Sequence, residues 1–361
     1  MANWGRRLVI TGATVFVICA GAVVAAMYSA NQFRSVAVTG NVACTAVTGV
    51  VGAEDIVVDL GRNRAFVSVD DRRAALAGQP VRGRIAMIDL SAPDLTPVDV
   101  TPAQPETFHP HGISLWTDPV SGERSLFVVN HIQGGLNEIG ISRVEIFGVE
   151  ADGRLVPRGG VIGAEMNSPN DVLAVGPNQF YASNDHGSTT GLGIMLENYL
   201  QLPRANVVYY DGKGFTRVAD GIRFANGLGL SPDGRQLYVA ETTGFAIRTY
   251  DRNPDSGRLT YRQSTPVDNG VDNIDMAPDG SLWVAGHPRL LDFVAHAGDA
   301  GKIAPSEVVR LTPAAGGLTV ETIMTDTGER LSASSVAAYA GPGRFLLGAV
   351  FDAKLLDCRV K

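Results

Sequence analysis

From residue 44 onward, turns rich in glycine, proline, asparagine or aspartate alternate with short apolar runs. One phrase recurs in six copies, "GRNRAFVSVDD", "GERSLFVVNH", "GPNQFYASNDH", "SPDGRQLYVAET", "APDGSLWVAGH" and "GPGRFLLGAVF". Short apolar runs between turn signals predict β-strands. The copies recur roughly every 50 residues, which is enough for four short strands and their turns. The pattern therefore predicts an all-β fold, a six-bladed β-propeller over residues 44–361.

The first 30 residues follow a different pattern. Arg6 and Arg7 precede an uncharged, mostly apolar run from Leu8 to Tyr28. A helix of this length, at about 1.5 Å per residue, reaches roughly the 30 Å of a bilayer core. Residues 1–30 are therefore predicted to form a signal anchor or transmembrane helix, followed by a linker over residues 31–43. The positive-inside rule then places the propeller outside the cytoplasm, and a secreted propeller released by signal cleavage is the alternative.

Net charge and cysteine positions indicate which partners and which cellular compartment the chain suits. The chain of 361 residues has a formal net charge of −7, whereas nucleic-acid binding needs clustered Lys and Arg, so no nucleic-acid partner is expected. Cys44 and Cys358 lie at the two ends of the predicted propeller, and Cys19 lies within the apolar run. In an oxidising compartment the two terminal cysteines can pair and close the ring of blades. The alternative is that both thiols stay unpaired.

Each predicted blade begins with a polar residue just before the recurrent phrase. These positions are Glu54-Asp55, His111, Asn170-Asp171, Asn226, Asp272-Asn273 and Ser334-Ser335. The innermost strands of a propeller lie side by side around a channel, so their first residues meet at one mouth of it. Crowded carboxylates repel, and a cation is the simplest compensation; an all-oxygen set favours calcium, which takes 6–8 ligands. The alternative is that these Asn and Asp residues only cap turns.

The histidines add a candidate base. His111 begins an inner strand and His131 ends the next strand, so both are expected near the same mouth. A neutral imidazole near pH 7 is suited to remove a proton from water. His186 and His287 end the matching strands of later blades, and they are expected either to line the pocket or to be structural.

Taken together, these motifs resemble the serum paraoxonase family of calcium-dependent lactonases and arylesterases. The phrases that carry the resemblance are "GAEDIVV", "HPHGIS", "LFVVNH", "NDVLAVGP", "FYASNDH", "VVYYDG", "FANGLGLSPDG", "VDNI", "LWVAGHP", "SEVVRL" and "SSVAAYAG". The similarity runs from about Cys44 to Cys358. The chain departs from the family after the "NDH" phrase, where Tyr199 is the only aromatic residue of "GSTTGLGIMLENYLQLP".

The resemblance implies two calcium ions with separate ligands. The catalytic ion is expected on Glu54, Asn170, Asn226, Asp272 and Asn273, and the structural ion on Asp55, Asp171 and the backbone carbonyl of Ile113. The resemblance also implies a catalytic pair, His111 and His131, and a Cys44–Cys358 disulfide. Because successive side chains of a strand point to opposite sides, Asn170 and Asp171 suit different ions.

The predicted function is a Ca²⁺-dependent hydrolase of lactones and aryl esters, which is a carboxylic-ester hydrolase. The metal is expected to polarise the carbonyl, while His111, assisted by His131, deprotonates the attacking water. A carboxylate, Asp272 or Glu54, is the alternative base or nucleophile. Two other functions are considered: a gluconolactonase-like sugar lactonase, against which the cysteine and histidine pairs weigh, and a non-catalytic propeller that calcium stabilises and that binds a partner.

Overall fold

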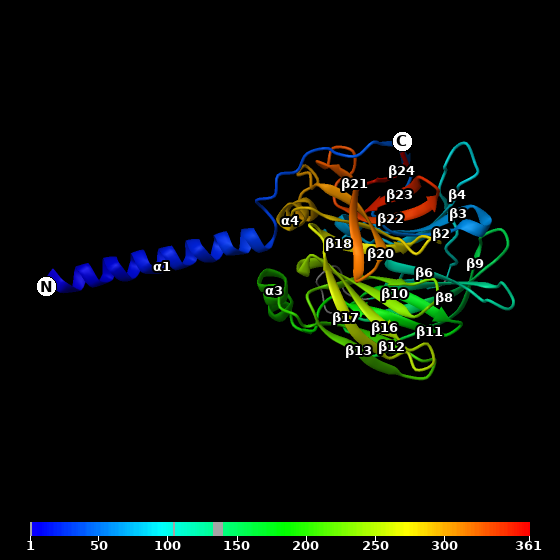
Figure 1. The fold of residues 1–361 in the computed structure, drawn as a ribbon, viewed down its shortest axis with the longest axis horizontal. Coiled ribbons are helices and arrows are strands. Elements are labelled where there is room, and N and C mark those ends of the chain that lie inside the picture. Colours follow the sequence, from blue (N-terminus) through cyan, green and yellow to red (C-terminus); the bar gives the residue numbers. More distant parts are fainter. Residues whose placement is uncertain (1, 104, 133–139) are drawn as a thin grey trace.

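The computed structural model describes residues 2–103, 105–132 and 140–361, with the backbone alone for residues 2–13 and 15. Within this part of the chain, the strands form six antiparallel sheets of four strands each (Figure 1). The inner strands of successive sheets are neighbours, and that of the sixth sheet also contacts that of the first, so the sheets form a closed ring. The predicted six-bladed β-propeller is confirmed.

The strands follow the chain from the centre of each blade outward. The first blade contains β2 (Ala53–Asp59), β3 (Arg64–Val69), β4 (Arg84–Asp89) and β5 (Val98–Asp99), and the second β6 (Pro110–Thr117), β7 (Arg124–His131), β8 (Ser142–Val149) and β9 (Leu155–Val161). The third contains β10 (Pro169–Gly176), β11 (Gln179–Asn184), β12 (Ala205–Tyr210) and β13 (Phe215–Ile222), and the fourth β14 (Ala225–Leu230), β15 (Gln236–Glu241), β16 (Ala246–Arg252) and β17 (Leu259–Pro266). The fifth contains β18 (Gly270–Met276), β19 (Leu282–His287), β20 (Ser306–Ala314) and β21 (Gly317–Asp326).

The sixth blade joins the two ends of the propeller. It contains β22 (Ser334–Gly341), β23 (Arg344–Ala349) and β24 (Lys354–Val360), and its outer strand is β1 (Val42–Thr48) from the start of the domain. Cys44 lies opposite Cys358 in the register of β1 and β24, and a disulfide joins them. The predicted disulfide and its place at the ring closure are confirmed.

Apolar residues of the recurrent phrase fill the space between blades. The six residues that anchor it, one on the second strand of each blade, are all buried: Phe66, Phe127, Phe180, Tyr238, Trp283 and Leu346. Phe127 of the second blade and Phe180 of the third lie in one apolar cluster, with ring centroids 6.1 Å apart. The repeat is therefore the sequence signal of inter-blade packing, since a single four-stranded blade cannot bury both of its faces.

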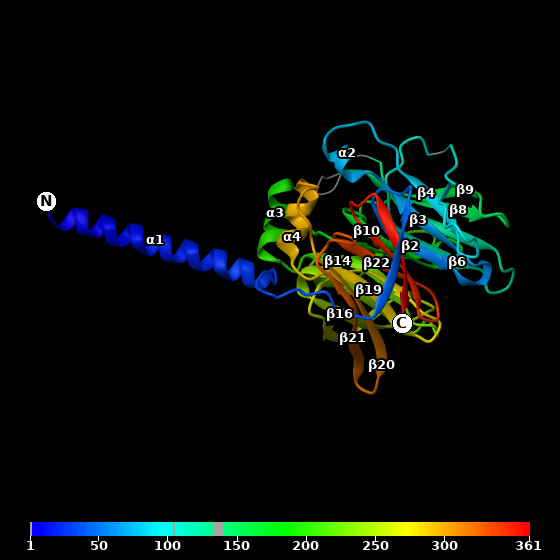
Figure 2. The same ribbon diagram turned by 90° about the horizontal axis from the view of Figure 1, so that it is seen from above.

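Helices gather at one end of the propeller. The long helix α1 (Ala2–Ser29) projects from it, and α3 (Gly191–Leu200) and α4 (Leu290–Gly298) lie where α1 meets the propeller (Figures 1 and 2). The N–H of Leu290 donates to the carbonyl of Ala30 at 3.1 Å, and Gln201 Nε2 donates to the carbonyl of Ser29 at 2.9 Å. The remaining helical segments are α2 (Arg72–Leu76) and the 3₁₀ turns η1 (Leu60–Arg62) and η2 (Thr242–Gly244).

A helix forms where the anchor was predicted. Whether this helix crosses a membrane depends on its length and its apolar character. Within the part of the chain that the structure describes, no helix combines the length and the apolar character needed to cross a bilayer. The predicted anchor includes side chains outside the described part, those of residues 1–13 and 15. Membrane anchoring therefore stays a prediction.

Candidate active site

The polar residues singled out in the sequence lie at irregular points of the inner strands. In every blade, the pairing of the inner strand with its neighbour shifts register there: between Ala53 and Ile56, Pro110 and Ile113, Pro169 and Asp171, Ala225 and Leu228, Val271 and Ile274, and Ser334 and Val336. A bulge bends a strand and re-aims its side chains. The simple alternation expected for Asn170 and Asp171 is thus modified by a bulge.

The first group of predicted ligands, which we call the cavity set, consists of Glu54, Asn170, Asn226, Asp272 and Asn273. All five side chains are buried. Asn273 Nδ2 donates to Glu54 Oε1 at 2.7 Å, which links the first and fifth blades across the sixth. Four buried oxygens of this set accept no hydrogen bond from any described residue: Glu54 Oε2 and the Oδ1 atoms of Asn170, Asn226 and Asn273. Unpartnered buried oxygens are costly, and a hard cation satisfies them, so these residues fit calcium.

The second group, the deep set, consists of Asp55, Asp171 and the backbone of Ile113. Asp55 Oδ2 accepts from the N–H of Ile113 and Asp171 Oδ2 from the N–H of Leu228, both at 2.7 Å. The other oxygen of each carboxylate accepts from the next residue of its own strand, at 2.8 Å for Asp55 and 2.7 Å for Asp171. Each carboxylate of the deep set therefore ties its strand to the inner strand of the following blade.

Close approach of the inner strands depends on two glycines. A Cβ added to Gly112 would lie 2.5 Å from Asp171 Cα, and one added to Gly227 would lie 2.6 Å from Asn273 Cα. Both distances are far below van der Waals contact. Any larger residue at either position would push apart the two neighbouring inner strands, β6 and β10 at Gly112 or β14 and β18 at Gly227.

Burial disfavours the charged form of these carboxylates. It raises the pKa of Glu54 to about 8, against the opposing charge of Arg72, and it raises the pKa of Asp171 to about 7. The pKa of Asp55 lies well above its usual range because of burial and of the neighbouring Asp171 and Glu54 carboxylates. A bound cation would favour the ionised forms and release protons on binding.

Neither set consists of acidic residues alone. Among the described residues, no three or more His, Cys, Asp and Glu side chains form a group that could hold a metal ion. Each predicted set contains two carboxylates, and its other donors are amide or backbone oxygens. Any calcium site here therefore depends on asparagine and carbonyl oxygens as much as on charge.

His111 and His131 lie side by side next to the cavity set. Nδ1 of His111 is 3.0 Å from Nε2 of His131, whose Nδ1 is 3.0 Å from Ser142 Oγ. On its other side, His111 Nε2 lies 3.6 Å from Glu54 Oε1. Burial lowers the pKa of His111 well below its usual range and that of His131 to about 4, so both imidazoles are neutral at pH 7. The pair is available to accept a proton, and its catalytic role stays a prediction.

The cavity set opens into a cavity of about 900 Å³. Four of its five residues line this cavity, together with both histidines of the pair, whereas no residue of the deep set does. Helices α2, α3 and α4 and the end of α1 form the outer wall, which includes Ile194, Tyr199, Leu290 and Phe293. A mostly apolar pocket of this size with a few polar groups at its base is typical of small-molecule sites.

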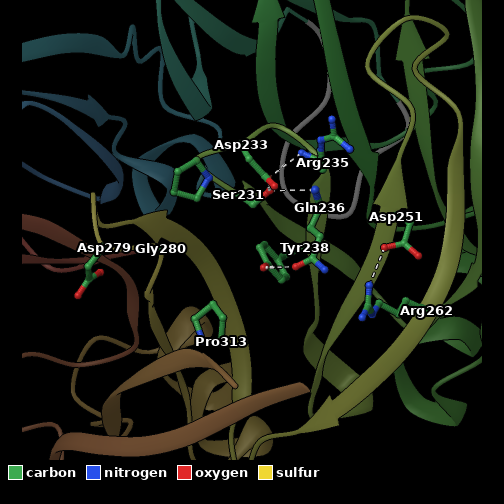
Figure 3. A pocket seen from close by; sticks show the side chains of 11 residues that line it. Ser231, Asp233, Arg235, Gln236, Tyr238, Asp251, Arg262, Asp279, Gly280 and Pro313 are labelled. Atoms are coloured by element: carbon green, nitrogen blue, oxygen red, sulfur yellow. Dashed lines mark hydrogen bonds and ion pairs between the residues drawn. The ribbon is translucent and has the colours of Figure 1, made fainter. Parts of the chain in front are cut away.

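A second depression, of about 530 Å³, lies between the fourth and fifth blades (Figure 3). It is lined by Tyr238, Pro313 and the exposed ion pair of Arg262 with Asp251, whose atoms are 3.0 Å apart. None of the predicted ligands or histidines lines it. The candidate active site is therefore the cavity above the cavity set.

Comparison with known proteins shows the family of the chain. The family model described as Arylesterase matches residues 35–360. Serum paraoxonase/arylesterase 1 of Mus musculus is 32% identical over 338 residues, which are 91% of this chain and 92% of that protein. The chain belongs to the arylesterase family. Serum paraoxonase/arylesterase 2 of Homo sapiens is 35% identical over 252 residues, 69% of this chain and 68% of that protein.

Membership of the arylesterase family confirms the predicted family and the enzyme class, that of carboxylic-ester hydrolases. Solved structures add support for the fold alone. A candidate gluconolactonase has a TM-score of 0.54 at 17% identity, covering 90% of this chain and 93% of its own. A luciferin-regenerating enzyme has a TM-score of 0.52 at 12% identity, covering 88% and 95%.

In this arylesterase-family chain, two further histidines of the cavity, His186 and His287, are both hydrogen-bonded. His287 Nε2 lies 2.9 Å from Asp272 Oδ2, so it supports a residue of the cavity set. His186 lies between Asp185 Oδ1 at 2.7 Å and Asn198 Oδ1 at 2.8 Å. Burial lowers the pKa of His186, but the Asp185 carboxylate outweighs burial and raises it to about 9. Both histidines line the cavity and are fixed by neighbours.

Several supporting residues were not identified from the sequence. Ser68 and Ser183 accept from the N–H groups of Asp55 and Asp171, each at 3.1 Å, and so satisfy backbone donors that the bulges leave unpaired. Their signal was a serine shortly after the aromatic anchor in the first and third copies of the repeat. Ser142, the partner of His131, had no such signal.

Proposed function

We propose that this arylesterase-family chain is a Ca²⁺-dependent hydrolase of lactones and aryl esters with two calcium ions. The catalytic ion is assigned to the cavity set and the structural ion to the deep set. The observation that carries the proposal is the group of four buried oxygens of the cavity set that have no hydrogen-bond partner among the described residues, three of them on residues that line the cavity. Calcium, when bound there, supplies a Lewis acid for the carbonyl of the substrate.

The histidine pair is assigned the proton transfer. A tautomer with the proton of His111 on Nδ1 donates to His131 Nε2, and His131 Nδ1–H then donates to Ser142 Oγ. This arrangement leaves Nε2 of His111 free to accept a proton from the attacking water. Glu54 Oε1, 3.6 Å from this nitrogen, is placed to stabilise the imidazolium that results. Assignment of the base to Asp272 or Glu54 remains the alternative within the same site.

We also propose that residues 1–30 anchor the enzyme in a membrane, with the propeller outside the cytoplasm. Support comes from the apolar run of the sequence and from the Cys44–Cys358 disulfide, which suits an oxidising compartment. Fractionation of cells and protease treatment of intact membranes test this. Propeller that stays in the cytosol would contradict it.

The function is tested by measuring hydrolysis of lactones and phenyl acetate before and after calcium chelation. We expect chelation to abolish turnover. Calcium that is added back before the protein unfolds should restore it. Full turnover by a protein shown by elemental analysis to be free of calcium would overturn the proposal.

A further inference from the structure

Two arginine side chains are buried among the described residues, and they differ in their counter-ions. Arg64 and Arg72 are each 5% exposed. Arg64 forms an ion pair with Asp59, with Nε 3.3 Å from Oδ2. Arg72 has no carboxylate oxygen within ion-pair distance in the described part of the chain. A buried cation with no carboxylate in direct contact is costly, so its retention calls for an explanation.

Only part of the hydrogen-bonding capacity of Arg72 is used. Nη1 donates to the carbonyl of Gly52 at 3.1 Å, and Nη2 donates to the carbonyl of Pro110 at 3.0 Å. A guanidinium has five N–H donors, so three of those of Arg72 have no partner among the described residues. The two carbonyls hold the guanidinium plane in place, between the start of β2 and the start of β6.

Arg72 lines the same cavity as Glu54 and His111. The nearby acidic groups are engaged elsewhere: Asp70 lies 3.2 Å from His109 Nδ1, and Glu54 belongs to the cavity set assigned to calcium. The cavity therefore contains a fixed positive group beside the candidate active site, with donors that have no partner among the described residues.

We propose that Arg72 forms a carboxylate subsite of the cavity, which binds the carboxylate released by ester or lactone hydrolysis. The inference rests on the proposed function. Water adds its oxygen to the carbonyl carbon and the C–O bond to the alcohol breaks. One proton of the water passes to the alcohol oxygen, and the other is released to solvent, which leaves the acid as a carboxylate. A planar guanidinium with free N–H groups binds a carboxylate through two parallel hydrogen bonds, which lysine cannot do.

The neighbouring Arg73 provides a matched control. It lies on the same helix, α2, and donates to the carbonyls of Phe351 and His296 at 3.3 and 2.7 Å, and it does not line the cavity. A purely structural role for Arg72 would change stability without changing the preference for a carboxylate over a neutral group.

The test is calorimetric titration of the calcium-loaded full chain with the hydroxy acid released from δ-valerolactone, and with the neutral amide of that acid. Arg72→Gln is expected to raise the Kd of the hydroxy acid about tenfold or more, while Arg73→Gln leaves it unchanged. Arg72→Lys should fall between wild type and Arg72→Gln. The amide should bind all variants equally. Equal Kd values of the hydroxy acid for wild type and Arg72→Gln would overturn the subsite.

Should Arg72→Gln fail to fold, a crystal structure of the wild-type protein with the hydroxy acid decides. Carboxylate oxygens within hydrogen-bond distance of the guanidinium support the subsite, and a carboxylate bound elsewhere contradicts it. Turnover of δ-valerolactone is measured separately. If the hydroxy acid binds at Arg72 but the lactone is not turned over, only the proposed function is contradicted. If the lactone is turned over but Arg72→Gln binds the hydroxy acid as the wild type does, only the subsite is contradicted.

Discussion

The cavity set and the deep set lie at the same bulged starts of the inner strands, yet their oxygens differ in the hydrogen bonds that they accept. Both oxygens of Asp55 and Asp171 accept backbone N–H groups, whereas four oxygens of the cavity set accept no hydrogen bond from the described residues. The backbone therefore fixes the deep carboxylates as part of the fold, and it leaves the cavity oxygens for a ligand. Changes in the two sets should differ in kind: the deep set should govern stability, and the cavity set chemistry.

The largest effect is expected from Glu54→Gln. The change keeps the size of the side chain but removes a charge from the cavity set, so we expect lactone turnover to fall about 10³-fold with weaker calcium binding. The free energy of unfolding without calcium should be unchanged or higher, because a buried carboxyl is removed. Turnover and calorimetric calcium affinity check this. If Glu54→Gln bound calcium with the affinity of the wild type, Glu54 would not be a calcium ligand.

Asp55→Asn should mainly affect folding. Its amide group would face the N–H of Ile56 or Ile113, so at least one charge-assisted hydrogen bond is lost and two donors oppose each other. We expect the free energy of unfolding in the presence of calcium to fall by about 3 kcal/mol. Denaturant titration measures it, with the exposed Asp94→Asn as control. If Asp55→Asn and Asp94→Asn were equally stable, the deep set would not govern the stability of the fold.

His111→Gln separates proton transfer from metal binding. We expect lactone turnover to fall about 10²-fold while calcium affinity stays that of the wild type. A near-native rate would remove His111 from the role of main base and favour a carboxylate of the cavity set. A loss of calcium affinity in this variant would show instead that the histidine acts through Glu54.

The smallest effect concerns the His186–Asp185 pair at the cavity wall. The pKa of His186 is raised to about 9 in the folded protein, above the usual value for histidine of about 6.5. Its contribution to stability is thus complete below about pH 6.5 and is lost as the pH rises through about 9. The difference in unfolding free energy between wild type and His186→Gln should shrink from pH 6 to pH 9.5. A constant difference would contradict the ion pair.

The blades and the buried polar positions of the inner strands could be predicted because both repeat along the chain. Phe66 and its equivalents mark the second strand of each blade, and the polar residue before each copy marks the channel. The bulges could not be predicted, since register depends on the neighbouring strand. Arg72 and Asn198 were missed because each lies in a connection outside the repeat and meets its partners only in the folded structure.

The most direct test of this account is a crystal structure of the calcium-loaded protein. We predict one ion about 2.3–2.6 Å from oxygens of Glu54, Asn170, Asn226, Asp272 and Asn273, and a second ion bound by Asp55, Asp171 and the carbonyl of Ile113. A fully active protein in which neither set binds a cation, or in which the Asn oxygens of the cavity set only bind water, would contradict it.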